Sequence, residues 1–281
     1  MRRFLPVLAL IISLCLAAGC TSAPPVHAAP PVQSMQAAPA VSINAAPVQY
    51  ADVNGVRLAY REFGSGDPLL VIVGFGVTME QANETAIGIF ASKYHVFLYD
   101  HRGMGHSSAG NVTPSIGMYA DDAAGLMQVL GHDSMHVYGT SMGSFIAQEL
   151  ALGHPERVRK MILDSPSYSI QVPEIRVLKV YLESVAVDPA SLPGLRDEAR
   201  AILAWNGTEE RLPAINKDVM LVVGTEDTIT PVVLSVRMAE KINSSWLVRF
   251  RGLPHAGGGV APEEYGRTTL FFLGTNESFG K

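Results

Sequence analysis

Short, uninterrupted apolar runs recur along the chain from residue 49 onward, and most of them are rich in β-branched residues. Continuous runs of this length are typical of strands that are buried on both faces of a parallel sheet. The predicted strands are "LLVIVG" (69–74), "HVFLYD" (95–100), "MHVYGT" (135–140), "MILDS" (161–165), "VMLVVGT" (219–225) and "WLVRF" (246–250). Helical stretches between and after them are predicted at 79–90, 115–130, 142–152, 231–242 and 262–273.

An antiparallel hairpin is predicted ahead of these strands. The segment "QYADVNGVRLAYREFG" (49–64) carries Asn54-Gly55 between two alternating stretches, which is the strongest short-range hairpin signal. The alternation of strands and helices that follows indicates βαβ crossovers. We therefore predict an α/β fold with a doubly wound, mostly parallel sheet, in which sites form beyond the carboxyl ends of the strands.

The alternation lapses over residues 167–217, which read as a small helical insertion that forms a lid over the sheet's top edge. Its apolar residues follow helical spacing in "IRVLKVYLESVAV" (175–187) and "RDEARAILAW" (196–205). Several of them are candidates for the wall of a substrate pocket, although a place in the core is the simpler interpretation for each: Tyr168, Ile170, Leu178, Tyr181, Leu182 and Trp205.

The first residues resemble a bacterial export signal rather than part of the fold. Arg2-Arg3 precede an uncharged apolar run over 4–16, which is too short to span a bilayer and is typical of a signal peptide. The run leads into Leu16-Ala17-Ala18-Gly19-Cys20, which resembles the lipobox of bacterial lipoproteins. We therefore expect residues 1–19 to be removed and Cys20 to be lipidated; the alternative is ordinary secretion with a coincidental cysteine.

Residues 20–48 are rich in alanine and proline and contain no Asp, Glu, Lys or Arg, a composition that favours a semi-extended tether. The folded domain is expected at 49–281. Removing two arginines with the signal peptide changes the net charge from −5 to −7, and this acidity argues against a nucleic-acid partner. Because Cys15 is lost with the signal, no cysteine pair remains for a disulfide and no thiol set for a metal.

A serine stands between two glycines in "VYGTSMGSF" (137–145), directly after a predicted buried strand and before a predicted helix. The G-x-S-x-G pattern by itself is weak, and a tight turn without chemistry is the alternative. In a strand–turn–helix setting, however, the pattern predicts a nucleophile elbow that holds the Ser141 hydroxyl at a helix N-terminus.

A serine nucleophile needs a base and a group that orients the base. Of the eight histidines only His255, in "GLPHAGGG" (252–259), follows the last strand. Asp227 lies just past a strand's carboxyl end and is the preferred acid. Asp164 is the competing acid, and a role as a helix cap or turn residue is the alternative interpretation of Asp227. For His101 and His106 a loop-bracing role is favoured over metal binding, because no carboxylate or cysteine set accompanies them.

With Ser141, Asp227 and His255 in this order, the chain resembles the α/β-hydrolase fold family over about residues 49–275. Three further segments are similar to family motifs: "DHRGMGHSS" (100–108), "VGFG" (73–76), and "AWNGTEERLPAINKDVMLVVGTEDTITP" (204–231), the last as in small esterases and cofactor-free haloperoxidase-type members. The resemblance implies an oxyanion hole made by the backbone N–H groups of Phe75 and Met142. Two positions depart from the family pattern: Val73 replaces a usual histidine and Asp218 a usual proline.

The expected function is that of a serine carboxylesterase for small to medium apolar acyl esters. Ser141 attacks the carbonyl, His255 transfers the proton and Asp227 orients His255, with no cofactor and no metal. A serine at the elbow argues against haloalkane dehalogenase and epoxide hydrolase chemistry. Perhydrolase, thioesterase, lactonase and carbon–carbon hydrolase activities use the same triad and stay open, as does a non-catalytic ligand-binding or envelope protein. We expect the protein to be anchored by lipid to the bacterial cell envelope, outside the cytoplasm; its oligomeric state is open.

Overall fold

The computed structural model describes residues 41–275. Their strands form one eight-stranded sheet with the order β1-β2-β4-β3-β5-β6-β7-β8. The first two strands run antiparallel to their neighbours, and the pairs from β4 to β8 are parallel. The strands are β1 (Gln49–Val53), β2 (Val56–Gly64), β3 (Asp67–Ile72), β4 (Tyr94–Tyr99), β5 (Met135–Thr140), β6 (Val158–Asp164), β7 (Asp218–Gly224) and β8 (Ser245–Phe250). The predicted α/β fold with a mostly parallel sheet is confirmed.

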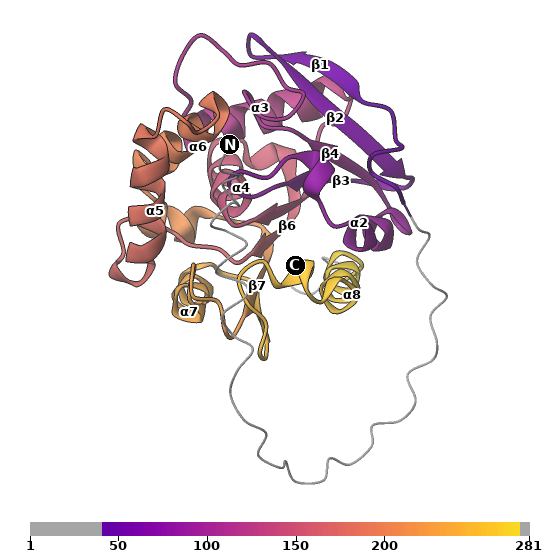
Figure 1. Cartoon of the computed structure of the whole chain (residues 1–281). Coiled ribbons are helices and arrows are strands. Elements are labelled where there is room, and N and C mark those ends of the chain that lie inside the picture. The colour runs from indigo at the N-terminus through magenta and orange to yellow at the C-terminus, as the bar shows by residue number, and fades with distance from the viewer. Residues whose placement is uncertain (1–40, 276–281) are drawn as a thin grey trace. The chain divides into compact units, whose positions relative to one another are not determined.

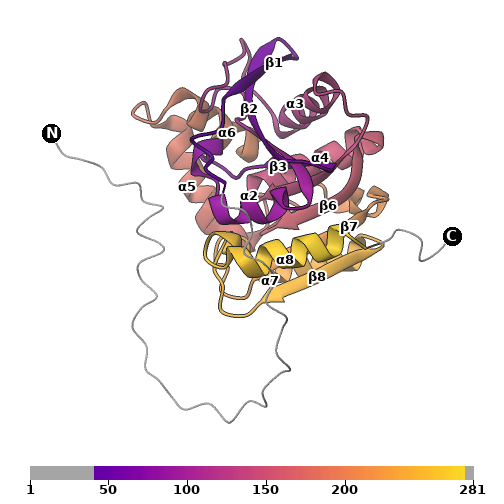
Figure 2. The same cartoon turned by 90° about the vertical axis from the view of Figure 1, so that its right-hand side faces the viewer.

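Both faces of the sheet are covered by helices (Figures 1 and 2). One apolar cluster joins the sheet to α3 (Ile116–Val129), α4 (Met142–Gly153) and α7 (Val232–Lys241). The other joins it to α2 (Glu84–Ala91) and α8 (Pro262–Leu273). Successive strand residues point to opposite faces, so each strand needs apolar side chains at consecutive positions, which explains the uninterrupted runs.

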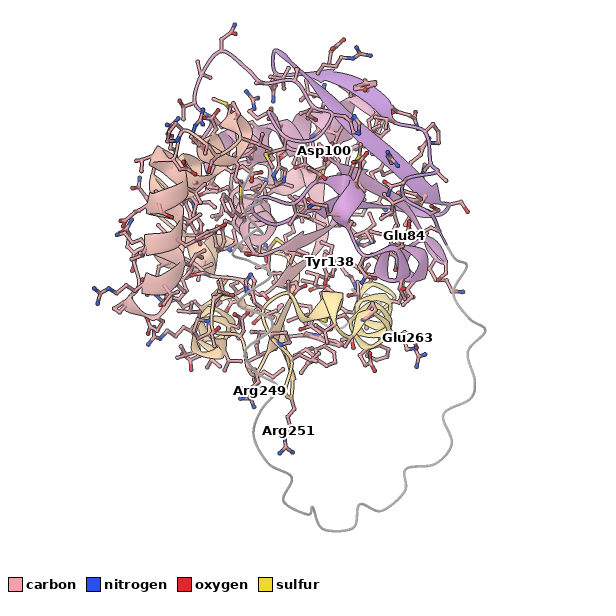
Figure 3. All side chains as sticks on the ribbon, in the orientation of Figure 1. Glu84, Asp100, Tyr138, Arg249, Arg251 and Glu263 are labelled. Atoms are coloured by element: carbon pink, nitrogen blue, oxygen red, sulfur yellow. The ribbon has the colours of Figure 1, made fainter. Side chains whose placement is uncertain are left out.

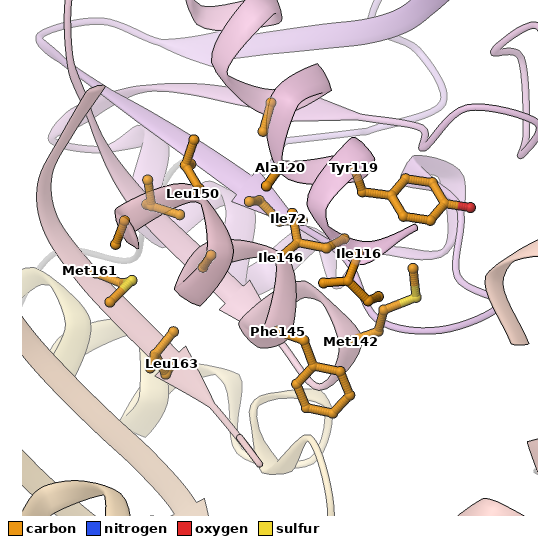
Figure 4. Packing of buried hydrophobic residues seen from close by; sticks show 14 of the residues in the cluster. Ile72, Ile116, Tyr119, Ala120, Met142, Phe145, Ile146, Leu150, Met161 and Leu163 are labelled. Atoms are coloured by element: carbon orange, nitrogen blue, oxygen red, sulfur yellow. The ribbon is translucent and has the colours of Figure 1, made fainter. Parts of the chain in front are cut away.

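Strand β3 shows this division residue by residue. Leu70 and Ile72 belong to the cluster with α3 and α4, whereas Leu69 and Val71 belong to the cluster with α2 and α8. Figure 4 shows Ile72 beside Ile146 of α4 within the first of these clusters. This cluster therefore packs α4 against β3.

The Asn54-Gly55 hairpin is confirmed, with φ of 47° at Asn54 and 77° at Gly55, as a type I′ turn requires. The single helix predicted over 79–90 is wrong in extent. A 3₁₀ turn at Met79–Gln81 is followed by a separate helix that begins at Glu84. Asn83 separates the two helical segments, because its side chain accepts a hydrogen bond from the Ala86 N–H at 3.0 Å and so caps α2.

Two helices occupy the insertion predicted as a lid, α5 (Arg176–Val187) and α6 (Pro193–Leu203), and they lie side by side in both views (Figures 1 and 2). The insertion packs directly on the sheet's helical layer, since Trp205 stacks on Phe145 of α4 with ring centroids 4.7 Å apart. Six residues of the insertion were candidates for either the core or the pocket wall, and they differ in burial. Buried are Tyr168, Ile170, Leu182 and Trp205, and half-buried are Leu178 and Tyr181.

Packed structure begins upstream of β1, inside the range expected to be a tether. Ile43 is fully buried, its N–H donates to Glu84 Oε1 at 2.7 Å, and its carbonyl accepts from Arg61. The boundary expected at residue 49 is therefore too late, because Ile43 and the partly buried Val41, Ala46 and Val48 pack against the domain. The expected signal peptide and Cys20 lie outside the described residues. Within 41–275, no helix has the length and apolar character needed to cross a bilayer.

Candidate active site

Ser141 occupies a sharp turn between β5 and α4, with φ of 53° and ψ of −116°. A positive φ is strained for a residue with a side chain and persists only where the surroundings impose it. Here the flanking glycines permit it: a β-carbon at Gly139 would collide with the carbonyl oxygen of Gly143, and one at Gly143 with that of Ile72. Ser144, which stands where a further glycine is common, donates its hydroxyl to the Ser141 carbonyl at 2.6 Å. The glycine pattern therefore reflects close backbone packing around Ser141.

The structure brings together the serine, the histidine and one acid predicted from the sequence. His255 Nε2 lies 2.9 Å from Ser141 Oγ, and His255 Nδ1 lies 2.9 Å from Asp227 Oδ2. Asp227 is buried while the His255 side chain is 21% exposed. This hydrogen-bonded chain gives Asp227, and not Asp164, the position next to the imidazole.

The Asp227 carboxylate is fixed by the turn that follows it. Oδ1 accepts the N–H groups of Ile229 at 2.9 Å and Thr230 at 2.8 Å, and the Thr230 hydroxyl lies 3.0 Å from Oδ2. Burial acts to raise the pKa of Asp227, but the hydrogen bond and charge of His255 together with these amides outweigh it, and the pKa is lowered. The carboxylate is therefore held ionised and directed at His255.

Asp164, the competing acid, has a different set of partners. It accepts the hydroxyl of Tyr138, an interior side chain labelled in Figure 3, at 3.0 Å and that of Ser165 at 3.1 Å. Burial raises its pKa to about 6, although the Tyr138 hydrogen bond opposes the rise. The Ser165 hydroxyl also accepts the Ala256 N–H at 2.9 Å. Asp164 thus supports, through Ser165, the loop that carries His255.

The two backbone N–H groups expected to form an oxyanion hole lie on elements next to Ser141. Met142 is the first residue of α4, where the N–H has no partner within the helix. Phe75 follows β3, and its N–H donates to no other residue within 41–275. A β-carbon at Gly74 would lie 3.4 Å from Ser141 Cβ, so the loop that contains Phe75 runs directly beside the serine.

The loop at 73–76 is held by a residue that sequence reasoning missed. Glu198, on α6, accepts the Gly76 N–H at 2.7 Å through Oε2, and its Oε1 lies 2.8 Å from His101 Nδ1. In the sequence Glu198 looks like one of several charged residues on a solvated helix face, and only the tertiary fold brings it to this loop. The bracing role expected of His101 agrees with this contact.

The histidines at 101 and 106 do not converge. His106 Nε2 lies 2.8 Å from Glu80, at the surface, while His101 faces the buried Glu198. In the described part of the chain, no three His, Cys, Asp or Glu side chains are placed to hold a metal ion together. The loop after β4 is tied instead by Asp100, labelled in Figure 3, whose carboxylate accepts the N–H groups of Met79 at 2.7 Å and His106 at 2.8 Å.

A serine hydroxyl bonded to an imidazole that an ionised carboxylate orients is an arrangement suited to acyl transfer, provided that N–H donors face the carbonyl oxygen. Comparison with known proteins identifies the same fold. A family described as alpha/beta hydrolase fold matches residues 67–189.

Among the relatives, a protein named putative carbamate hydrolase RutD, from Azorhizobium caulinodans, is 26% identical over 261 residues, which are 80% of this chain and 98% of that one. The putative non-heme bromoperoxidase BpoC of Mycobacterium tuberculosis is 36% identical over 109 residues, or 38% of this chain and 41% of its own length. A solved thermophilic esterase from Thermogutta terrifontis superposes with a TM-score of 0.70 at 21% identity, over 81% of this chain and 98% of that chain. This last likeness shows the shared fold.

Proposed function

We propose that this enzyme, which has the α/β-hydrolase fold, is a serine hydrolase that cleaves small to medium apolar carboxylic esters. The observation that carries the proposal is the hydrogen-bonded chain from Ser141 Oγ through His255 to Asp227, with both links at 2.9 Å. Ester cleavage by such a chain proceeds in two steps through a covalent acyl-enzyme.

In the first step His255 Nε2 removes the proton of Ser141 as Oγ attacks the ester carbonyl. The carbonyl oxygen becomes negatively charged and accepts hydrogen bonds from the N–H groups of Phe75 and Met142. His255 then passes its proton to the departing alcohol, and the acyl group stays on Ser141. In the second step a water molecule, deprotonated by His255, attacks the acyl carbonyl and releases the acid.

The ionised Asp227 contributes in both steps. Its Oδ2 accepts the Nδ1–H of His255, so Nε2 is left free to accept the serine proton. Its negative charge stabilises the imidazolium that forms while the proton is in transit. The N–H groups of Ile229 and Thr230 keep the carboxylate in place during this change of charge.

The preference for apolar acyl groups follows from the residues around the Phe75 loop. The Phe75 ring meets Tyr181 of α5 edge-on, with centroids 6.3 Å apart, and both side chains are half-buried. Leu195 of α6 packs beside Gly76. An acyl chain that extends from Ser141 toward the insertion would therefore meet apolar side chains.

Carbamates are the second substrate class, favoured by the relative named as a putative carbamate hydrolase, which matches along 98% of its length. A carbamate carbonyl is attacked by the same serine and places its oxygen in the same position. Perhydrolysis and the cleavage of thioesters, lactones and carbon–carbon bonds use the same serine, histidine and aspartate. Only a comparison of substrates separates these reaction classes.

The test is a panel of p-nitrophenyl esters from acetate to laurate, with an aryl carbamate beside them, on the full chain in mild detergent. We expect turnover with short to medium chains and loss of turnover in Ser141→Ala. A fluorophosphonate probe should label the native protein and not Ser141→Ala. Labelling that persists in Ser141→Ala would contradict the assigned nucleophile, and a native protein with neither turnover nor labelling would contradict the proposal and favour a binding role.

The proposal includes a place for the enzyme. The apolar segment and the small residues before Cys20 support lipidation of that cysteine and a location on the extracytoplasmic side of the bacterial cell envelope. Substrates there would be small esters that reach the envelope from outside or from its lipids.

A further inference from the structure

Helix α6 of the insertion contacts the loop beside Ser141 through a buried carboxylate. Both Glu198 and His101 have 0% side-chain exposure. Each Glu198 oxygen has its own partner: Oε2 accepts the Gly76 N–H at 2.7 Å and Oε1 lies 2.8 Å from His101 Nδ1. His101 Nε2 has no partner among the described residues, which favours the tautomer that donates its proton from Nδ1 to Glu198.

The helix is docked too closely for this contact to be incidental. A β-carbon at Gly194, in the first turn of α6, would collide with the carbonyl oxygen of Gly103, in the loop after β4. The Leu195 side chain lies 3.0 Å from the position that a β-carbon at Gly76 would take. One helix therefore holds the loops that follow both β3 and β4.

Joining two elements through a buried carboxylate has a high cost in free energy. Removing its charge from water carries a large penalty, and apolar replacements of buried ion pairs are often neutral or stabilising. The rings of Tyr99 and Tyr119 flank His101 at 5.5 and 5.3 Å between centroids. Burial raises the pKa of both tyrosines, and negative charge adds to the rise, from Asp122 and then Glu198 at Tyr99 and from Glu198 at Tyr119. The residues that Glu198 positions therefore explain its place in the fold better than a contribution to stability does.

The Gly76 N–H belongs to the peptide plane that directly follows Phe75. Fixing this plane restricts ψ of Phe75 and, with Gly74 packed against Ser141, limits the directions in which the Phe75 N–H can point. Val73 offers this loop no polar side chain. The insertion also places Tyr181 and Leu195 against this loop, and the Glu198 carboxylate adds a hydrogen bond to its backbone.

We propose that Glu198 is a positioning residue for the oxyanion hole. From α6 it holds the loop that contains Phe75, to which Val73, just past the end of β3, offers no polar side chain. The inference rests on the proposed function, because it assigns the Phe75 N–H to the charged carbonyl oxygen. It makes α6 part of the machinery of the reaction, since displacement of α6 releases Gly76.

The test compares three variants of the full chain. Glu198→Met keeps the side-chain length and removes both acceptor oxygens, and Glu198→Gln keeps one acceptor oxygen. Asp197→Ala is a control on the same helix, because the Asp197 carboxylate contacts Arg200 at 3.3 Å. For p-nitrophenyl butyrate we expect kcat to fall about 10²-fold in Glu198→Met, the effect typical of one oxyanion donor, with KM nearly unchanged. Glu198→Gln should recover kcat to within about 10-fold of native, because its oxygen still accepts from Gly76. Asp197→Ala should be native.

A structural readout accompanies the kinetics. Amide hydrogen exchange of the peptide that covers residues 73–79 should be faster in Glu198→Met and native in Asp197→Ala. Tm of Glu198→Met should fall, because the buried Gly76 N–H and His101 Nδ1 lose their partner. Native kcat and native exchange in Glu198→Met would overturn the proposal. So would a folded Glu198→Gln with the full loss of kcat, and this comparison decides the matter if Glu198→Met does not fold. If the native protein turns over no ester, the proposed function fails, and the exchange measurement still tests the brace.

Discussion

Asp227 Oδ2 lies 2.9 Å from Nδ1 of His255, on the opposite side of the imidazole from Ser141. In Asp227→Asn the amide cannot hold the tautomer that leaves Nε2 free to accept a proton. We expect kcat for the best ester to fall by about 10³- to 10⁴-fold with KM little changed. The matched control is Glu226→Gln, because Glu226 is adjacent and exposed and should be dispensable. Equal losses in the two variants would contradict the assignment of the acid.

Asp164 should make the folded protein less stable as the pH rises. Its pKa is raised by burial from 3.8 to about 6 in the folded state, so folding favours the protonated form. Its stabilising contribution is complete below about pH 4 and is lost as the pH rises through about 6, a change of roughly 3 kcal/mol. Urea unfolding between pH 4 and 8 should therefore show a flatter pH dependence in Asp164→Asn than in the native protein. Parallel curves for the two proteins would contradict this interpretation.

The turn at Ser141 should not tolerate a side chain at Gly143. Its β-carbon would collide with backbone atoms of Ile72 and Val73, which cannot move aside as a flexible side chain could. We therefore expect Gly143→Ala to lose several kcal/mol of stability or not to fold. Gly153→Ala is the control, because Gly153 ends the same helix with nothing within 4 Å of the added carbon. It should be neutral or stabilising by up to about 1 kcal/mol. Thermal unfolding measures both, and a native-like Tm for Gly143→Ala would show that the turn is looser than the structure implies.

Lipidation of Cys20 predicts that the protein fractionates with membranes and that Cys20→Ser releases it. The reason is that acyl chains on the N-terminal cysteine supply the anchoring free energy, about 0.8 kcal/mol for each buried CH₂ group. Cell fractionation with metabolic palmitate labelling measures both consequences. Membrane retention that is unchanged in Cys20→Ser would rule out the lipobox interpretation.

The main elements could be predicted because their causes are local. Uninterrupted apolar runs such as "VMLVVGT" and the Asn54-Gly55 turn signal depend on neighbouring residues alone, and each predicted strand is present in the structure. The same holds for Ser141, whose strand–turn–helix context is written in consecutive residues. The break at Asn83 was missed because a capping asparagine inside an apolar periodicity is a weak signal.

The residues that support the site could not be predicted because their partners are distant in sequence. Glu198 meets Gly76 across 122 positions and Ser165 meets the Ala256 N–H across 91. Nothing in the local pattern separates Glu198 from its charged neighbours on α6. Ile43 was missed for the same reason, since its backbone partners, Glu84 and Arg61, are distant in sequence and its immediate neighbours are rich in alanine and proline.

The close approach of Gly194 to Gly103 has a practical meaning for engineering. Grafting the insertion of a relative onto this sheet, as a way to change the acyl group accepted, would replace the residues that support the site as well as those that contact the acyl group. A graft without a glycine at 194 would be pushed away from the loop after β4, and a graft without a carboxylate at 198 would leave Gly76 unsupported. Chimeras should therefore keep residues 193–198 from this chain and vary α5, where Tyr181 faces Phe75 and the reacting groups are untouched.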